Sequence, residues 1–191
     1  MNNNLFLKEN FLAFAHRGGN EFAPENSYKS FKNAVDMGYR YLETDVHLTK
    51  DGYLIAFHDN SLDRVTNKTG LIKDLNLREV KEAKIDGSEE IPLLSELLDS
   101  FSNCFFNIDC KVDETVKPLI SLIKSRSIVE RVCVGSFSQK RIDFIRNNLG
   151  KSVNTSMGPK EILLAKALSF VLNPIFTNYT PSFYNILFNN F

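Results

Sequence analysis

The feature that most limits the fold of this 191-residue chain is a repeated alternation of short apolar runs with longer segments of helical spacing. The strongest apolar run, at residues 104–110, is followed by a helical segment at 114–124. The same order returns in strands at 131–137 and 153–157 and in helices at 139–149 and 160–172. Repeated strand and helix units with nearly continuous apolar strands indicate a parallel sheet covered by helices.

The first half of the chain contains the same kinds of element in a less regular order. A strand at 11–15 stops at a glycine-rich loop, and the next helix begins at the capping residues 24–27 and ends at Gly38. Strands at 41–48 and 53–57 are joined by a turn, without a helix between them. The remaining segments are a polar loop at 59–70 and helices at 75–83 and 92–101.

This order of elements predicts an α/β fold of the (β/α)8 TIM-barrel type, with a doubly wound open sheet as the alternative. The strands number about six, whereas a full barrel has eight and usually takes about 250 residues, with about 200 as the lower bound. We therefore expect residues 1–191 to form a single barrel domain that lacks the final two strand and helix units. Open barrel edges would favour self-association.

Composition and charge exclude several classes of partner. The hydrophobic content of 43% suits one globular domain, and the formal net charge of zero with scattered basic residues gives no nucleic-acid surface. The apolar residues 5–7 are interrupted by charges, which leaves no signal peptide of adequate length. The apolar segment 162–176 falls short of the roughly 20 residues of a spanning helix and predicts a buried amphipathic helix instead. We expect a cytoplasmic protein without stable membrane insertion.

The three cysteines predict reduced thiols. Cys104, Cys110 and Cys133 are few, odd in number and placed in strand-like runs. Buried thiols fit this placement better than a disulfide framework or a cysteine metal site.

Pairs of polar residues stand at the ends of two expected strands. Glu43 and Asp45 are two residues apart and therefore project from one face of their strand. Two carboxylates held side by side resist joint ionisation unless a cation lies between them, which favours Mg²⁺ or Ca²⁺. Asp109 and Lys111 repeat this spacing at the end of another strand, where one could bind the metal and the other a phosphate oxygen. A solvated strand end and a surface ion pair are the alternatives for the two pairs.

Two histidines follow strands in the same way. His16 comes after the strand at 11–15 and His58 after the strand at 53–57, so both would face the mouth where parallel strands end. Histidine can take a proton from an attacking oxygen and give one to a leaving oxygen, as cleavage of a phosphodiester requires. Arg17 adds a fixed cation that can hold a phosphate oxygen.

His47 and the adjacent glycines 18 and 19 each allow two interpretations. Strict alternation puts His47 on the face of Glu43 and Asp45, but hard cations favour oxygen ligands, and we expect a loop histidine there instead of a third ligand. The two glycines either permit close approach of the backbone or only form a turn.

A set of short motifs follows a fixed order through about the first 110 residues. The motifs are His16-Arg17, Pro24-Glu25-Asn26-Ser27, Glu43-x-Asp45, His58-Asp59, Asp63-Arg64-x-Thr66 with Gly70, and Asn107-Ile108-Asp109-Cys110-Lys111. In this order they resemble the glycerophosphodiester phosphodiesterase family, whose fold is the (β/α) barrel. Beyond them the resemblance thins to a general strand and helix pattern.

The resemblance implies a phosphoric diester hydrolase that depends on a divalent cation, Mg²⁺ or Ca²⁺. Its substrate would be a small glycerophosphodiester, cleaved to glycerol 3-phosphate and an alcohol such as choline or ethanolamine. The site residues that the resemblance implies are the acid and base pair His16 and His58, the metal ligands Glu43, Asp45 and Asp109, and the phosphate-binding residues Arg17 and Lys111.

Two features depart from the family's pattern. Asp109 stands where members commonly carry glutamate, and its shorter side chain draws the ligand back by about one methylene. The family continues beyond the region that matches residues 177–184 with two further units, including a strand with tryptophan, and this chain has no tryptophan. The alternatives are a competent minimal enzyme, an inactive fragment, a fragment completed by a partner or second copy, and a related phosphodiesterase that acts on lysophospholipids.

Overall fold

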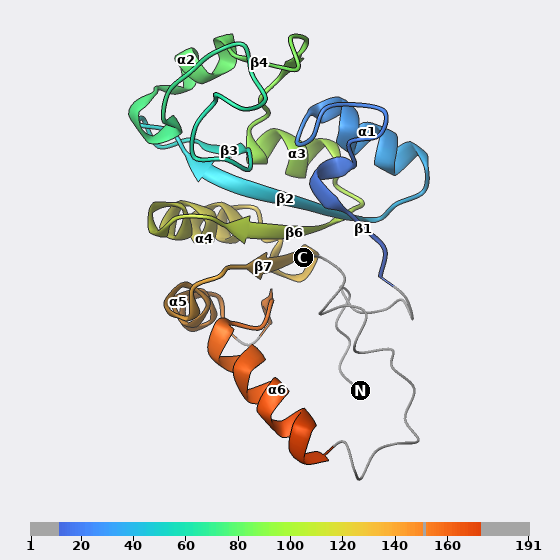
Figure 1. The fold of residues 1–191 in the computed structure, drawn as a ribbon, viewed down its shortest axis with the longest axis vertical. Coiled ribbons are helices and arrows are strands. Elements are labelled where there is room, and N and C mark those ends of the chain that lie inside the picture. The colour runs from blue at the N-terminus through green and yellow to red at the C-terminus, as the bar shows by residue number, and fades with distance from the viewer. Residues whose placement is uncertain (1–11, 151, 173–191) are drawn as a thin grey trace. The chain divides into compact units, whose positions relative to one another are not determined.

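A six-stranded sheet organises the computed structural model, which describes residues 12–150 and 152–172 (Figure 1). Five strands pair in parallel in the order β1-β2-β6-β7-β8, and β3 pairs antiparallel with the end of β2. The strands are β1 (Phe14–Ala15), β2 (Tyr41–Leu48), β3 (Leu54–Ala56), β6 (Phe105–Cys110), β7 (Val132–Gly135) and β8 (Asn154–Thr155). The predicted parallel sheet and the helix-free connection between β2 and β3 are confirmed.

The parallel strands follow one another in sequence order, as they do in a (β/α) barrel. A doubly wound sheet would reverse its strand order at a switch point, and the described strands contain no reversal. β1 and β8 stand at the two ends of the order, so the sheet formed by the described residues is open. A barrel-type fold with about six strands is therefore confirmed.

The expected helices begin and end within a few residues of their predicted bounds. They are α1 (Tyr28–Asp36), α2 (Leu77–Glu82), α3 (Leu94–Ser100), α4 (Val116–Ser125), α5 (Gln139–Leu149) and α6 (Pro159–Leu172). α1 begins after Ser27, whose hydroxyl accepts a hydrogen bond from the Ser30 N–H at 3.1 Å. Ser138 caps α5 in the same way. Such caps satisfy backbone donors that the first turn of a helix leaves without partners.

The main core lies between the sheet and the helices. Leu42 of β2, Phe106 and Ile108 of β6 and Val134 of β7 are fully buried on one face of the sheet, against apolar residues of α1, α3, α4 and α5. These strand residues alternate with side chains that point to the opposite face. The core thus fixes which residues each strand presents on that opposite face.

The opposite face carries a layer of aromatic rings and, beyond it, the polar residues. The rings of Phe14 and Tyr41 have centroids 5.3 Å apart, and those of Tyr41 and Phe105 are stacked at 5.0 Å. Glu43 and Asp45 follow Tyr41 on the same face at spacings of two residues. The aromatic layer therefore supports the polar end of the sheet.

A smaller core lies within the segment between β3 and α3. Its buried residues are Ile55, Phe57, Leu62, Ile72, Val80, Ala83, Ile85 and Ile91. The segment includes a hairpin of β4 (Lys84–Ile85) and β5 (Glu89–Glu90), which the sequence pattern does not predict because two-residue strands show no alternation. This core anchors the loop that follows His58.

The three cysteines are free thiols, as predicted. Cys104 and Cys110 are buried and Cys133 is half-buried. Burial raises the pKa of Cys110 and of Cys133 to about 12, so neither thiol is a reactive thiolate at neutral pH.

Helix α6 belongs to a second compact unit, residues 159–191, and is described by itself. Leu163, Leu164 and Leu168 are exposed, so the prediction of a buried amphipathic helix is wrong for this part of the chain. Among the helices in the described ranges, none combines the length and the hydropathy needed to cross a bilayer. Residues 5–11 and 173–184, on which other predictions rest, lie outside the described residues.

Candidate active site

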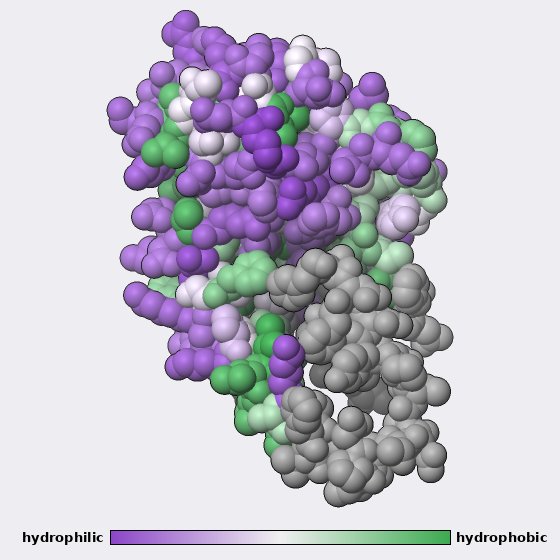
Figure 2. Space-filling model, viewed as in Figure 1, coloured by the Kyte–Doolittle hydropathy of each residue, from purple (hydrophilic) through white to green (hydrophobic). Residues whose placement is uncertain are grey.

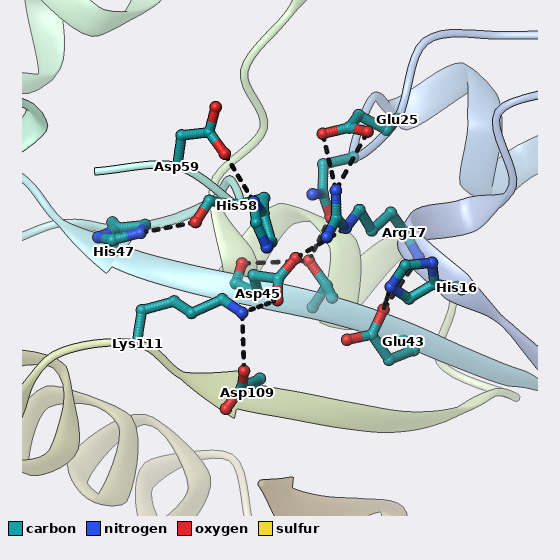
Figure 3. Close-up of polar contacts among 12 residues, drawn as sticks. His16, Arg17, Glu25, Glu43, Asp45, His47, His58, Asp59, Asp109 and Lys111 are labelled. Atoms are coloured by element: carbon teal, nitrogen blue, oxygen red, sulfur yellow. Dashed lines mark hydrogen bonds and ion pairs between the residues drawn. The ribbon is translucent and has the colours of Figure 1, made fainter. Parts of the chain in front are cut away.

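Polar side chains from four strands meet at the carboxyl end of the sheet (Figure 3). The register places Glu43 beside Asn107 and Asp45 beside Asp109, so the polar residues of β2 and β6 are neighbours. The other groups gathered at this end are His16 and Arg17 after β1, His58 after β3, and Lys111 after β6. The structure therefore brings all seven predicted site residues to one end of the sheet.

The turn after β1 requires two glycines for different reasons. Arg17, Gly18 and Gly19 all have positive φ angles, of 51°, 77° and 81°. A Cβ on Gly18 would lie 2.8 Å from the Phe31 backbone nitrogen of α1, whereas a Cβ on Gly19 would meet open space. Close backbone approach therefore explains Gly18, and the turn conformation alone explains Gly19.

Arg17 ties this turn to β2 and to the loop before α1. Its backbone N–H donates to Glu43 Oε2 at 3.0 Å, and its Nε lies 3.3 Å from Asp45 Oδ2. Its Nη1 donates to both carboxylate oxygens of Glu25, at 3.1 and 3.2 Å. The guanidinium group is thus fixed on two sides, as suits a cation that receives an incoming phosphate.

His16 is the more exposed of the two predicted catalytic histidines. Its side chain is 65% exposed, and its Nε2 lies 3.8 Å from Glu43 Oε2. Partial burial and then the neighbouring Arg17 cation lower the pKa of His16. The ring is therefore neutral at neutral pH, and a neutral imidazole can accept a proton.

Glu43 and Asp45 are buried carboxyl groups on one face of β2, as their spacing predicts. Their side chains are 13% and 3% exposed. Burial, and then repulsion by Asp45, raise the pKa of Glu43 to about 7, although the Arg17 N–H opposes the shift. Asp109 adds further repulsion. The resistance to joint ionisation inferred from the sequence is therefore present at this site.

Lys111 contributes a second cation beside Arg17, and it contacts the carboxylates of Asp45 and Asp109. Its Nζ is 2.8 Å from Asp45 Oδ1 and 2.8 Å from Asp109 Oδ2. Burial acts to lower the pKa of Lys111, but the hydrogen bonds to Asp109 and Asp45 outweigh burial and raise it. In the part of the chain that the structure describes, no three histidine, cysteine or acidic side chains are grouped closely enough to hold a metal ion.

His58 is oriented by the residue that follows it. Its Nδ1 lies 2.6 Å from Asp59 Oδ1, and because an ionised carboxylate only accepts, Nδ1 carries the proton of this hydrogen bond. Arg64 donates to both oxygens of Asp59, from Nε at 2.5 Å and from Nη2 at 3.2 Å. The hydrogen bonds from Arg64 are the largest of the effects that lower the pKa of Asp59 to about 2, so this carboxylate is ionised at neutral pH.

The expectation of a loop histidine at position 47 is wrong. His47 lies within β2 and is only 5% exposed. Its Nε2 donates to the backbone oxygen of His58 at 3.0 Å (Figure 3). Burial is the main cause that lowers the pKa of His47, so the ring is neutral with one N–H to donate. His47 therefore links β2 to the loop that carries His58.

Two residues of the loop before α1 support the site, although no site role for them is expected from the sequence. Glu25 accepts from Arg17 and also, at 2.6 Å, from Arg64 Nη2. Asn26 has a φ of 55°, and its N–H donates to the Arg17 carbonyl at 2.8 Å. Its Oδ1 accepts from the Thr44 hydroxyl at 2.8 Å. The sequence signal for Glu25 and Asn26 is their place in the motif Pro24-Glu25-Asn26-Ser27, to which the resemblance assigns no site role.

A hollow of about 370 Å³ lies between the turn after β1 and α1. His16 and Arg17 line it on the polar side, and Phe22, Met37 and Tyr39 line it on the apolar side. The side chains of Phe22 and Met37 are 64% and 58% exposed. Figure 2 shows mostly hydrophilic side chains around β2 and its neighbouring loops, with a paler apolar area beside α1. The hollow thus places apolar side chains beside His16 and Arg17.

This chain is similar to known proteins of one family. The model of the glycerophosphoryl diester phosphodiesterase family matches residues 16–159. A probable glycerophosphodiester phosphodiesterase 2 of Mycobacterium tuberculosis is 35% identical over 153 residues, which cover 80% of this chain and 58% of that protein.

Two solved structures share the fold. A glycerophosphodiester phosphodiesterase of Agrobacterium tumefaciens has a TM-score of 0.69 and 27% identity, over 75% of this chain and 65% of that one. A phosphodiesterase of Oleispira antarctica, solved with the product sn-glycerol-3-phosphate, has a TM-score of 0.66 and 26% identity, over 74% of this chain and 63% of that one. This chain spans a little over half the length of the curated relatives that it matches.

Proposed function

This chain belongs to the glycerophosphoryl diester phosphodiesterase family, and from that premise we propose that it hydrolyses glycerophosphodiesters to glycerol 3-phosphate and an alcohol. The observation that carries the proposal is the meeting of two histidines with two cations and three carboxyl groups at one end of the sheet. Arg17 and Lys111 supply the positive charge that a phosphodiester anion needs, and both contact Asp45. His16 and His58 stand beside these charged groups.

The proton transfers fall to the two histidines. The neutral ring of His16 suits the group that takes a proton from the attacking water. For the second transfer His58 must carry a proton on both ring nitrogens, and it then gives the Nε2 proton to the leaving alcohol oxygen while Nδ1–H stays bonded to Asp59. The hydrogen bond from its Nδ1 to Asp59 holds the ring in one orientation and leaves Nε2 for the substrate.

We place a divalent cation, Mg²⁺ or Ca²⁺, with Glu43, Asp45 and Asp109. Carboxylate oxygens are the ligands that these hard ions prefer. Asp109 Oδ1 is buried without a hydrogen-bond partner among the described residues, which is consistent with an oxygen available to a ligand, whereas Asp45 Oδ2 lies in an ion pair with Arg17 Nε at 3.3 Å. When bound, such an ion polarises the phosphoryl group. Lys111, whose Nζ lies 2.8 Å from both Asp45 and Asp109, would contact the phosphate beside this site.

The described sheet is open, and we propose that a second copy of the chain completes it by self-association. The strand order supports this, because the sheet of the described residues runs from β1 to β8 and does not close into a barrel. Light scattering combined with an activity titration tests it. A dimer whose activity per mole rises with protein concentration is expected, whereas a fully active monomer would contradict it.

We also propose a cytoplasmic location, which the three free thiols support because cytosolic proteins keep cysteines reduced. Fractionation of the native cells checks this location. Recovery of the protein outside the cytoplasm would count against it.

The catalytic proposal is tested with purified protein and glycerophosphocholine, in Mg²⁺ or in Ca²⁺. Release of glycerol 3-phosphate is expected from the wild-type protein and from the control Arg126→Gln, which removes a surface ion pair with Asp99. The variant Asp109→Asn should lose activity and its response to the ion. A protein that melts cooperatively and yet releases no glycerol 3-phosphate with either ion would refute the proposal.

A lysophospholipid is the second candidate substrate. The observation in its favour is the apolar wall of the hollow beside His16, where Phe22 and Met37 are exposed. Lysophosphatidylcholine and glycerophosphocholine share the phosphodiester and differ in the acyl chain. The lysophospholipid is the substrate if the wild-type kcat/KM is higher for lysophosphatidylcholine than for glycerophosphocholine and this preference falls in Phe22→Ser. The glycerophosphodiester is the substrate if the wild type and Phe22→Ser each show equal kcat/KM for the two compounds.

A further inference from the structure

Arg64 lies between the two loops that carry the proposed catalytic histidines. Its Nη2 is 2.6 Å from Glu25 Oε1, in the segment that follows β1. Its Nε is 2.5 Å from Asp59 Oδ2, in the loop that follows β3. Glu25 and Arg64 are 39 positions apart in the chain, so this contact joins two distant segments. Neither the proton transfers nor the phosphate binding described above makes use of Arg64.

Each carboxylate that Arg64 contacts already holds a residue of the site (Figure 3). Glu25 accepts two hydrogen bonds from Arg17, the proposed phosphate-binding arginine. Asp59 accepts from the Nδ1 of His58. The five side chains therefore form one continuous line from Arg17 through Glu25, Arg64 and Asp59 to the His58 ring, with Arg64 in the middle. Networks of this kind fix the orientation of each member more strongly than separate pairs do.

We propose that Arg64 is a positioning residue that holds the guanidinium group of Arg17 and the imidazole ring of His58 in a fixed relation to each other. The inference rests on the proposed function, in which these two groups act on the same phosphodiester. It assigns a role to the Asp63-Arg64-x-Thr66 motif. Arg64 acts through Glu25 and Asp59 and has no contact of its own with the reacting atoms.

The loop that carries Arg64 is built to hold it in place. The Leu62 N–H donates to the Gly70 carbonyl at 3.0 Å, and the Thr66 hydroxyl donates to the Leu62 carbonyl at 2.8 Å. Leu62 itself is buried in the smaller core. The base of the loop is therefore anchored while its arginine extends over the site.

A simple surface ion pair is the alternative for Arg64, whose side chain is 48% exposed. Exposed pairs usually hold nothing in place. Here, however, the two carboxylates are only 17% and 22% exposed, and one guanidinium group bridges both. Arg126 provides a matched surface pair, since it contacts both oxygens of Asp99 at 2.9 and 2.8 Å on α3. A comparison of variants at Arg64 and Arg126 therefore distinguishes a positioning role from a simple surface ion pair.

Steady-state kinetics of Arg64→Gln, Arg64→Lys and Arg126→Gln form the first test, with glycerophosphocholine as substrate. Because small displacements of reacting groups reduce rates strongly, Arg64→Gln should lower kcat about 10- to 100-fold. Its KM should change by less than about threefold, since Arg17 and Lys111 still bind the phosphate. Arg64→Lys should recover part of the rate, and Arg126→Gln should match the wild type. The proposal would be overturned if Arg64→Gln had the same kcat as Arg126→Gln, or if Arg64→Gln changed only by a higher KM.

A double-mutant cycle tests whether Arg64 acts through Asp59. If it does, the kcat of the double variant with Arg64→Gln and Asp59→Asn should lie within about twofold of the kcat of the slower single variant. Losses that multiply would mean that the two residues act independently, and the positioning role would be wrong.

A measurement that needs no activity separates this inference from the proposed function. In nitrogen-correlated NMR spectra, the Nδ1–H of His58 should give a signal because Asp59 shields it from exchange with water. The signal should broaden in Arg64→Gln and persist in Arg126→Gln. Persistence in both variants overturns the positioning role even if the enzyme is active. Broadening only in Arg64→Gln supports the role even if glycerophosphocholine is not cleaved.

Discussion

The ammonium group of Lys111 lies 2.8 Å from the carboxylate of Asp45, which is only 3% exposed. Lys111→Met keeps the length of the side chain and removes its charge. Breaking a buried ion pair by removing one partner costs about 3 kcal/mol, because the remaining charge stays buried. We expect a lower unfolding temperature in EDTA and a larger stabilisation by Ca²⁺ than the wild type shows. Identical Ca²⁺ responses would mean that the ion does not bind at these carboxylates.

Glu43 should make the stability of the cation-free protein fall as the pH rises. Burial and Asp45 raise its folded pKa to about 7 from the ordinary value of 4.5. Between these values the folded protein holds a proton that the unfolded chain has released, so this contribution is complete below 4.5 and lost as the pH rises through about 7. The shift corresponds to about 3 kcal/mol in full.

Urea unfolding in EDTA at about pH 5 and about pH 8 measures this loss. The variant Glu43→Gln should lose less stability across the interval than the wild type, because it cannot ionise in a buried position beside Asp45 and Asp109. Arg17 and His16 also face Glu43, and Arg17 opposes the shift. Glu130→Gln, at an exposed position, is the control. A wild-type slope that Glu43→Gln leaves unchanged would show that another group titrates.

The two glycines of the turn after β1 should respond differently to alanine. Gly18→Ala forces a Cβ against the backbone of α1 and also strains a φ of 77°, whereas Gly19→Ala has only the strain of a φ of 81°. We expect Gly18→Ala to lower the free energy of unfolding by about 1 to 3 kcal/mol more than Gly19→Ala, and to displace His16. Denaturant unfolding of both variants checks the difference. Equal losses would mean that close approach to α1 does not constrain this turn.

His47 should be replaceable only by a residue that can donate a hydrogen bond. His47→Leu leaves the backbone oxygen of His58 without its donor, which costs about 1 to 3 kcal/mol when the acceptor is buried. His47→Gln retains an N–H donor and should lose less stability and less activity. Thermal melts and kcat measurements of both variants check the order. A glutamine variant no better than the leucine variant would contradict this role.

The sheet and most helices follow from the sequence because their signals are local. The alternation of apolar and polar residues in β2 and β6 is visible in the sequence itself. The serine that caps α1 is visible there too. The hairpin of β4 and β5 is not predictable in this way, since two-residue strands carry no period. The exposure of the α6 leucines runs against the sequence pattern, because a helix with apolar residues all round it is expected to be buried.

The meeting of His16, Arg17 and Lys111 is predictable because the parallel strands β1 and β6 end on one side of the sheet. His58 joins them for another reason, since the antiparallel strand β3 returns the chain along β2 toward Asp45.

The connections among the site residues, by contrast, are not predictable. No spacing rule pairs Glu25 with Arg64 across 39 positions, because tertiary folding alone brings them together. The position of Lys111 between Asp45 and Asp109 likewise depends on strand register, which pairs β2 with β6 residue by residue. The expectation of a loop histidine at His47 fails for a similar reason. Alternation along the strand shows which face His47 occupies, but it does not show the hydrogen bond to the His58 backbone oxygen.

The rate of glycerol 3-phosphate release by the folded protein, compared with the rate of the folded His58→Gln variant, tests the proposed activity most directly. Both are assayed with glycerophosphocholine and Ca²⁺ or Mg²⁺, and a cooperative melt confirms the fold of each. Because His58 is assigned a proton transfer, its loss should lower kcat about 100- to 10,000-fold. Equal rates in the two proteins, or no release from a folded wild-type protein, would contradict the assignment of this site as a phosphodiesterase.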